Sequence, residues 1–396
     1  MKSLSVRILT ALITFTIGVG IASLWLTRWR LNPEIVPVIA PVTTEAPAAR
    51  LEMVFVLDTT GSMGGLIEGA KQRIWGIVNG VMQGSHASVR IGLVAYRDRG
   101  DDYVTKVLPL TDDLDKVYTT LMNFKANGGG DTPEDVRTAL AVGLNKAGWS
   151  PAAPDLSQIM FLVGDAPPHN NYENTVDTLT TAANAIGKGI IVNTIQCGDM
   201  PETARAWKAI AQRGDGQYFA IAANGGVQAI TTPYDEQIGD LASKLGATFV
   251  SYGFAREANA EAKRAAVNTQ EAEAEAQVTY AAPAIAKAER GVNKVLNSKA
   301  YIGDLLQDIE NGSVKLETMD PANLPASLQA MSPAERQQEI EKRLAARREL
   351  RSQIMSLSKE RADFIAAEQK KTGDSGSGFD VVVSRAVQKQ MVKRQF

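Results

Sequence analysis

The stretch from residue 51 to residue 65, LEMVFVLDTTGSMGG, constrains the fold of this chain more than any other. Residues 53–57 form an apolar run, too short for a globular helix and rich in strand formers, which predicts a strand buried on both faces, as in a parallel sheet. Asp58, Thr60 and Ser62 follow at spacings of two, so one carboxylate and two hydroxyls can converge in a single glycine-containing loop. In open α/β sheets ligands bind at the carboxyl ends of strands, and hard oxygen donors suit a small divalent cation. The stretch therefore predicts a site for Mg²⁺ or Mn²⁺.

The spacing Asp-x-Thr-x-Ser after a buried strand resembles the metal-ion-dependent adhesion site of von Willebrand factor type A (VWA) domains. Two distant segments match the same family in chain order: GGGDTPE at 128–134 is similar to its threonine loop, and FLVGD at 161–165 to the strand that ends in its second aspartate. The resemblance covers roughly residues 51–249 and departs from the family only in having Thr60 where serine is commoner. It implies one set of metal ligands: Asp58, Thr60, Ser62, Thr132 and Asp165. It also implies Mg²⁺, or Mn²⁺ or Ca²⁺, whose coordination is completed by an Asp or Glu side chain of a partner protein.

Each of these loops also has a purely structural interpretation. Ser62 is of a residue type that helices prefer at the N-cap. The same holds for Thr132, which precedes a proline at the expected first helical position. Asp165, before Ala-Pro-Pro, is typical of a turn. The acidic residues beside the threonine loop are interpreted as favouring the next helix through its dipole, with tuning of the cation as the alternative: Asp131, Glu134 and Asp135. The metal site would be excluded only if all three structural interpretations were correct. Three matching loops in the expected order therefore favour the interpretation as a cation site.

The first 30 residues predict a signal anchor that spans a membrane. Residues 8–26 run for 19 positions without a charge, which is enough to cross a bilayer core, and tryptophans and arginines follow at once. A cleaved signal peptide is the alternative, which the length of the run and the bulky residues at its end disfavour. Residues 31–50 are rich in proline and alanine and predict an extended linker. Lysine and arginine are balanced on the two sides, and we expect the soluble part to be extracytoplasmic, in the periplasm.

Strands and helices alternate from residue 51, which predicts a doubly wound, mostly parallel α/β sheet of the VWA or Rossmann-like type over residues 51–250. We expect residues 103–110 to form a hairpin with residues 89–96, which gives the sheet one antiparallel edge strand. The further strands are expected at 158–163, 190–196 and 217–221. Helices are expected at 66–82, 112–124, 132–147, 175–187, 201–212 and 234–245.

Residues 251–396 predict an α-helical region that is partly like a coiled coil. Residues 255–277 are helix-prone but poor in large apolar side chains, and residues 292–309 are amphipathic. Ser-Pro-Ala-Glu at 332–335 is a capping box for a helix to about residue 371. Its apolar stripe, interrupted by Arg361, is more typical of packing on the same chain than of an oligomeric coiled coil: Leu350, Ile354, Leu357 and Phe364. A flexible break at 373–378 precedes a last amphipathic helix at 381–393.

The composition limits the classes of function. A chain of 396 residues is long enough for two or three domains, and a net charge of −2 with 22% charged residues gives no indication of a nucleic-acid partner. Cys197 is the only cysteine, so no intramolecular disulfide forms, and its apolar context predicts a buried thiol.

We expect protein binding through the cation rather than catalysis. The alternative is metal-assisted hydrolysis with His169, four residues after Asp165, as the base; the sequence offers this histidine no evident orienting partner. A third possibility is a tethered scaffold whose metal site is unused. The partner and the oligomeric state do not follow from the sequence.

Overall fold

The structure is a computed structural model that describes residues 49–85, 87–225, 230–297, 301, 303–372 and 378–392. The predicted signal anchor lies outside these residues, and so does nearly all of the predicted linker. Among the helices that are described, none combines the length and the apolar character needed to cross a membrane.

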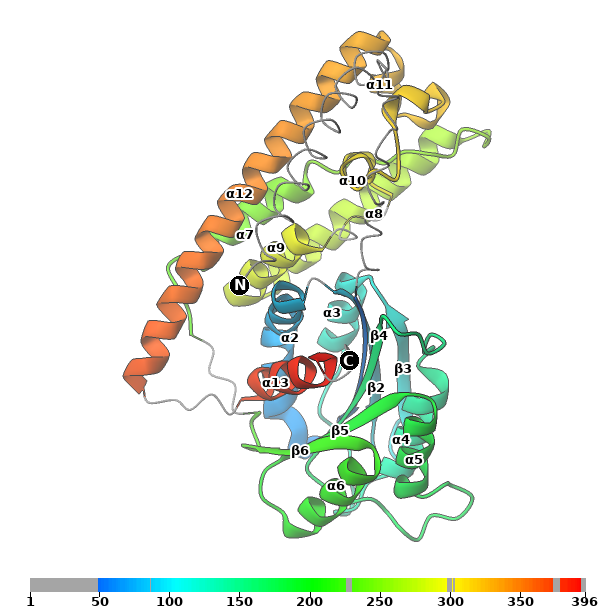
Figure 1. The fold of residues 1–396 in the computed structure, drawn as a ribbon, viewed down its shortest axis with the longest axis vertical. Helices are drawn as coiled ribbons and strands as arrows, with labels where there is room; N and C mark the ends of the chain where they lie inside the picture. Colours follow the sequence, from blue (N-terminus) through cyan, green and yellow to red (C-terminus); the bar gives the residue numbers. More distant parts are fainter. Residues whose placement is uncertain are drawn as a thin grey trace, which may run out of the picture. The chain divides into compact units, whose positions relative to one another are not determined.

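Six strands form one sheet in the order β3-β2-β1-β4-β5-β6 (Figure 1). Their bounds are β1 (Arg50–Asp58), β2 (Ser88–Tyr96), β3 (Thr105–Thr111), β4 (Leu156–Gly164), β5 (Ile190–Cys197) and β6 (Asp215–Ile221). All neighbouring strands pair in parallel except β2 and β3, so the predicted antiparallel edge strand is confirmed. The chain continues from β1 to β2 on one side and later returns as β4 on the other side. The ends of β1 and β4 therefore flank the topological switch point of the sheet.

Helices cover both faces of the sheet (Figure 1). One layer contains α2 (Gly64–Ser85), α3 (Leu114–Met122) and the C-terminal α13 (Phe379–Val392), and the other contains α4 (Val136–Lys146), α5 (Thr178–Gly187) and α6 (Pro201–Arg213). In β1, Phe55 packs in the first layer and Val56 in the second, which explains why residues 53–57 of the strand are all apolar. The Phe55 ring lies 6.0 Å from the ring of Phe379, so α13 belongs to the core of the sheet domain. Cys197 is buried and free, as predicted.

The remaining helices follow the sheet in the chain. They are α7 (Asp235–Gly246), α8 (Ala260–Ala281), α9 (Ala284–Leu296), α10 (Leu305–Glu310), α11 (Ala326–Gln329) and α12 (Pro333–Thr372), with short 3₁₀ turns η1 (Gly61–Met63), η2 (Leu316–Thr318) and η3 (Pro321–Asn323). The predicted capping box of α12 is confirmed, because the backbone N of Ser332 donates to Glu335 Oε2 at 2.9 Å. The amphipathic stretch at 292–309 holds the end of α9 and most of α10. The chain breaks there and α10 starts again at the Asp304 side chain, which accepts a hydrogen bond from the backbone N of Gln307.

The long helix α12 packs on its own chain. Ile354 is fully buried in a cluster with side chains of α7 and α9, which confirms the intramolecular interpretation of its apolar stripe. Arg361, which interrupts the stripe, is buried as well: its Nε lies 2.7 Å from Asp235 Oδ1 and its Nη2 lies 3.4 Å from Glu289 Oε1. A charge within the apolar stripe is thus accommodated by two carboxylates of neighbouring helices.

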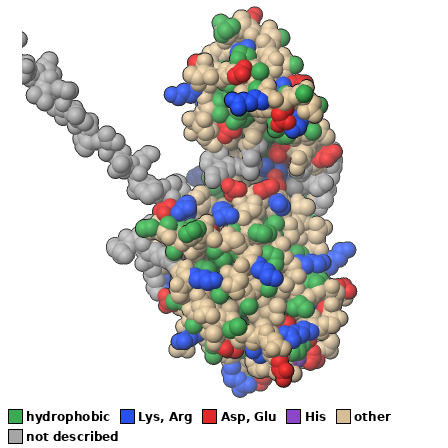
Figure 2. Space-filling view, turned by 90° about the vertical axis from the view of Figure 1, so that its right-hand side faces the viewer, with side chains coloured by type: hydrophobic (Ala, Val, Ile, Leu, Met, Phe, Trp, Pro, Cys, Tyr) green, Lys and Arg blue, Asp and Glu red, His purple; other side chains and the backbone are tan. Residues whose placement is uncertain are grey.

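Charged side chains of both signs are interspersed on the surface. Figure 2 shows one face on which Lys and Arg lie among Asp and Glu, in keeping with 42 basic and 44 acidic residues in the chain. Many pairs are exposed, such as Arg205 and Glu202 at 2.8 Å, and exposed pairs contribute about 0–1 kcal/mol each. The stability of the fold therefore depends mainly on its buried apolar side chains.

Candidate functional site

The carboxyl ends of three adjacent strands carry acidic residues. Asp58 is the last residue of β1, Asp165 directly follows β4, and Asp98 follows β2 by two residues. The register pairs Leu57 with Val163, so Asp58 and Asp165 leave neighbouring strand ends. This is the switch point, from which the chain continues to α2 on one face and to α5 on the other. The topology thus places the predicted site where ligands bind in open α/β sheets.

The structure brings Asp58, Thr60 and Ser62 together. Asp58 is fully buried, and its Oδ1 accepts hydrogen bonds from the backbone N and the Oγ1 of Thr60, at 2.9 and 2.6 Å. Thr60 Oγ1 lies 3.5 Å from Ser62 Oγ. Ser62 lies inside the turn η1, and the N-cap of that turn is Thr60, so the alternative of Ser62 as an N-cap is wrong.

The threonine loop packs against the Asp58 loop. The backbone N of Gly61 donates to the carbonyl of Gly128 at 3.2 Å. Gly129 has a φ of +83°, and a Cβ at this position would lie 3.2 Å from Thr60 Cβ. Glycine at 129 therefore allows both the left-handed backbone and the close approach of the two loops.

Thr132 is exposed in the threonine loop. The helix predicted to begin at Thr132 begins at Val136 instead, so this prediction is wrong by four residues. The physical reason is the Asp135 side chain, which caps α4 by accepting from the backbone N of Thr138 at 3.0 Å. The capping role expected for the acidic residues of this loop is thus confirmed for Asp135, and Thr132 does not serve as the N-cap.

Asp165 lies close to Asp58. A Cβ on the preceding residue, Gly164, would lie 3.2 Å from Asp58 Oδ2, so the β4 backbone passes directly beside the buried carboxylate. Asp165 itself is half-buried, and its backbone carbonyl accepts a hydrogen bond from Thr203 Oγ1 at 2.8 Å.

Acidic side chains lie close together where the ends of β1 and β4 meet the threonine loop. Burial raises the pKa of Asp58 to about 7 against the hydrogen bonds from Thr60, and the charge of Asp165 adds to the rise. Burial also raises the pKa of Glu134 to about 9, with Asp58 and Asp98 among the charges that raise it further. Asp58 Oδ2 and Glu134 Oε2 are both buried without a hydrogen-bond partner. Such oxygens are costly unless a cation neutralises them, so the donor set fits a divalent cation.

Glu134, which the sequence interpretation related to the helix dipole with tuning of the cation as the alternative, lies in the site with its Oε2 buried. Its backbone N donates to the carbonyl of Pro167 at 3.0 Å, and the backbone N of His169 donates to the Glu134 carbonyl at 3.0 Å. These bonds join the threonine loop to the loop after β4. The only signal in the sequence was its position two residues after Thr132, which equally suits a helix N-terminus.

A second group of possible metal ligands lies at the same edge of the sheet: Asp98, Asp131 and His169. One ligand atom from each lies within 4.8 Å of the others. His169 also has the orienting partner that the sequence did not reveal, because its Nδ1 lies 3.0 Å from Asn171 Oδ1.

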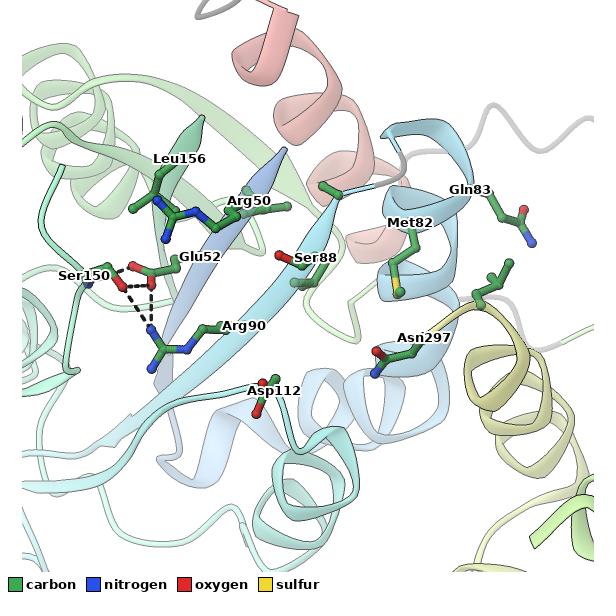
Figure 3. Close-up of a pocket in the computed structure, with 14 residues that line it drawn as sticks. Arg50, Glu52, Met82, Gln83, Ser88, Arg90, Asp112, Ser150, Leu156 and Asn297 are labelled. Atoms are coloured by element: carbon green, nitrogen blue, oxygen red, sulfur yellow. Dashed lines mark hydrogen bonds and ion pairs between the residues drawn. The ribbon is translucent and has the colours of Figure 1, made fainter. Parts of the chain in front are cut away.

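A cavity of about 500 Å³ lies at the opposite edge, where the first residues of three neighbouring strands line it (Figure 3). Its buried carboxylate, Glu52, accepts hydrogen bonds from Arg90, Ser150 and Gln158 at 2.5–3.0 Å. Burial would raise the pKa of Glu52, but these partners lower it. Both oxygens are satisfied, so this network stabilises the fold and the acidic edge is the better candidate for function.

Comparisons with known proteins match the part of the chain that forms the sheet. Residues 52–233 match the sequence profile of the von Willebrand factor A domain family. The chain is 32% identical over 204 residues to von Willebrand factor A domain-containing protein 7 of Rattus norvegicus, which covers 50% of this chain and 21% of that protein. It is 28% identical over 137 residues to an ariadne-like RING finger protein of Acanthamoeba polyphaga mimivirus, which covers 33% of this chain and 13% of that protein.

This chain thus spans about a fifth or less of the length of these relatives. Among solved structures, the conserved hypothetical protein BatB from Bacteroides thetaiotaomicron matches at 17% identity with a TM-score of 0.32, over 44% of this chain and 90% of that one. The sequence profile and the sequence relatives identify residues 52–233 as a von Willebrand factor A domain.

Proposed function

We propose that this chain is a membrane-anchored protein whose VWA domain binds a divalent cation and, through it, an acidic residue of a partner protein. The proposed ligands are the five residues that the sequence singled out: Asp58, Thr60, Ser62, Thr132 and Asp165. The observation that carries the proposal is the fully buried Asp58 with its unpartnered Oδ2 at the switch point of the sheet. The proposed cation is Mg²⁺, with Mn²⁺ and Ca²⁺ as alternatives.

The residues of the chain have separate tasks in this proposal. The Thr60 hydrogen bonds hold Asp58 Oδ1, so Oδ2, which has no hydrogen-bond partner, would be the oxygen that holds the cation. The hydroxyls of Ser62 and Thr132 carry no charge, so the ligand set leaves much of the positive charge unneutralised. When bound, the cation supplies an open coordination position that a partner carboxylate can fill. The buried backbone around Gly164 keeps the acidic ends of β1 and β4 together.

Cation binding can be tested on the full-length chain without knowing the partner. Chelator-treated protein is titrated with Mg²⁺ and Mn²⁺ by isothermal titration calorimetry, and Asp58→Asn is expected to remove the binding. Asp363→Asn is the matched control, because Asp363 is an exposed aspartate of α12 paired only with Lys359 in the described part of the chain. Equal affinity of Asp58→Asn and wild type would refute the proposed ligand set.

Partner binding needs a second experiment. The full-length chain is used to capture proteins from native membranes with Mg²⁺ and with chelator, and Asp58→Asn is run beside it. A protein retained only by the wild type and only with Mg²⁺ supports the proposal. Capture that is unaffected by both chelator and substitution would show that binding does not pass through the cation.

We also propose that the domain binds rather than catalyses. His169 was the sequence candidate for a base, but its Nδ1 is engaged by Asn171 and its Nε2 lies between two carboxylates. Metal-dependent turnover of ester or phosphoester substrates that is lost in His169→Gln would overturn this part of the proposal.

A further inference from the structure

Asp98, Asp131 and His169 form a second group of possible ligands, with two carboxylates and an imidazole instead of carboxylates and hydroxyls. None of the three belongs to the five-residue site of the proposed function. His169 Nε2 lies 3.4 Å from Asp98 Oδ2 and 3.5 Å from Asp131 Oδ1. Nε2 is buried and has no hydrogen-bond partner, and His169 as a whole is 9% exposed. From this geometry we infer that Asp98, Asp131 and His169 form a second metal site, of the class that binds Zn²⁺ with one imidazole and two carboxylates.

The hydrogen bond on the other ring nitrogen determines what His169 Nε2 offers. Asn171 Oδ1 can only accept, so its 3.0 Å contact with His169 Nδ1 is a hydrogen bond in the tautomer that carries the proton on Nδ1. With the proton on Nδ1, the neutral ring leaves a lone pair on Nε2, which is the form that binds metals. A lone pair that faces two carboxylates is unfavourable unless a cation lies among them. Metal-binding histidines usually make such a hydrogen bond from the second ring nitrogen.

The separations between the ligand atoms are those expected of a four-coordinate metal site. A charged N–H···O⁻ hydrogen bond measures about 2.7–2.9 Å, which is much shorter than the separations from His169 Nε2. Ligand atoms at about 2.0–2.2 Å from a tetrahedral Zn²⁺ lie about 3.3–3.6 Å apart. The observed 3.4 and 3.5 Å agree with two edges of such a tetrahedron. An octahedral Mg²⁺ at about 2.1 Å would require edges of about 3.0 Å, so these two separations, together with the imidazole ligand, point to zinc rather than magnesium. The third pair of ligand atoms lies within 4.8 Å.

The surroundings hold the ligands in place and leave one side open. The Tyr172 hydroxyl lies 2.7 Å from each carboxylate oxygen of Asp98 and donates to it, and the Tyr172 ring stacks on His169 at 4.2 Å between centroids. Within the residues that the structure describes, no lysine or arginine forms an ion pair with Asp98 or Asp131. The nearby Arg99 pairs with Asp135 at 2.8 Å. The Asp131 side chain is 64% exposed, which gives a metal ion and a fourth ligand, water or a partner group, access to the site.

The test measures Zn²⁺ binding to the full-length chain in an Asp58→Asn background, so that the proposed Mg²⁺ site does not contribute. Chelator-treated protein is titrated with Zn²⁺, and Co²⁺ serves as a spectroscopic probe whose visible absorption identifies four-coordinate geometry. Asp58→Asn alone is expected to bind one Zn²⁺ and to show the four-coordinate Co²⁺ spectrum. Adding His169→Gln is expected to weaken Zn²⁺ binding by at least about 100-fold, since it removes a ligand itself.

Two further variants keep the test decisive. Asn171→Ala leaves every proposed ligand in place and is expected to weaken Zn²⁺ binding by about 10–100-fold, because His169 loses the bond that orients it. His86→Gln, at the only other histidine of the chain, is the matched control and should bind Zn²⁺ as the background does. Far-UV circular dichroism checks that each variant is folded; if His169→Gln fails to fold, Asn171→Ala decides.

Two results would overturn the inference: no Zn²⁺ binding by the folded background protein, or equal Zn²⁺ affinity with and without His169. Failure of the proposed Mg²⁺ site would give a different result: the wild type would bind Zn²⁺ but would not bind Mg²⁺. The two sites can therefore be refuted separately.

Discussion

Replacing Arg290 by methionine tests whether the helices after the sheet stabilise the VWA domain. Arg290 of α9 is 3% exposed and donates to Asp115 of α3 at 2.8 and 2.7 Å. It also donates to Glu275 of α8 at 2.5 and 2.8 Å. Burial alone would raise the pKa of Asp115, but the charges of Arg290 and Lys294 outweigh it and hold this pKa well below its usual value.

The expected magnitude follows from what the substitution leaves behind. Removing one partner of a buried pair costs about 3–5 kcal/mol, because the remaining charge is buried and uncompensated. Here Lys294 Nζ still lies 3.0 Å from Asp115 Oδ2 and 3.6 Å from Glu275 Oε1, so compensation is partial. Arg290→Met keeps an apolar stem of similar length and should lower the free energy of unfolding by about 3 kcal/mol, the lower end of the range.

Urea denaturation of the full-length chain measures this change, followed by far-UV circular dichroism and by tryptophan fluorescence. Trp75, one of the five tryptophans of the chain, lies buried in α2, a helix that packs against α9, so the fluorescence includes a signal from this interface. The matched control is Arg205→Met, which removes a 75% exposed arginine and should change stability by less than about 0.5 kcal/mol. A loss below about 1 kcal/mol for Arg290→Met, or two transitions that do not coincide, would refute the view that α9 and the sheet form one cooperative unit.

Three further predictions concern pH, backbone space and the cation. Because the folded-state pKa of Asp115 lies below its unfolded value of about 3.9, its stabilisation is fully present above that pH and is lost as the pH falls through the folded-state pKa; Asp115→Asn should therefore be less stable than wild type near neutral pH, and the difference should shrink steadily in urea titrations between about pH 4 and about pH 2. Gly164→Ala would place a Cβ 2.5 Å from the Tyr96 hydroxyl and should cost about 1–3 kcal/mol in thermal unfolding, whereas Gly187→Ala, where nothing lies within 4 Å, should not destabilise. Mg²⁺ at 100 times its Kd should stabilise the wild type by about 2.7 kcal/mol and leave the unfolding of Asp58→Asn unchanged.

Much of the sheet could be predicted because its strands carry a strong local signal. β1, β4 and β5 are buried on both faces and contain apolar runs rich in strand formers, which mark them in the sequence. Helix ends were harder to predict, because several neighbouring residues can each serve as the cap that starts or ends a helix. Thr132 with its following proline was a good candidate cap, but Asp135 reaches the backbone N of Thr138 and fixes the start of α4.

The two candidate sites differ in how far sequence alone could reveal them, and strand order explains the difference. Asp58, Thr60 and Ser62 belong to one loop, so their spacing alone predicts that their oxygens meet. Asp98 and His169 belong to loops after β2 and β4, which lie on either side of β1, and Asp131 comes from the loop between α3 and α4. Polar loop residues have no periodicity that would predict their neighbours. Only the pairing of β1 with both β2 and β4 brings these loops to one edge, so a ligand set drawn from all of them depends on the complete fold of the domain.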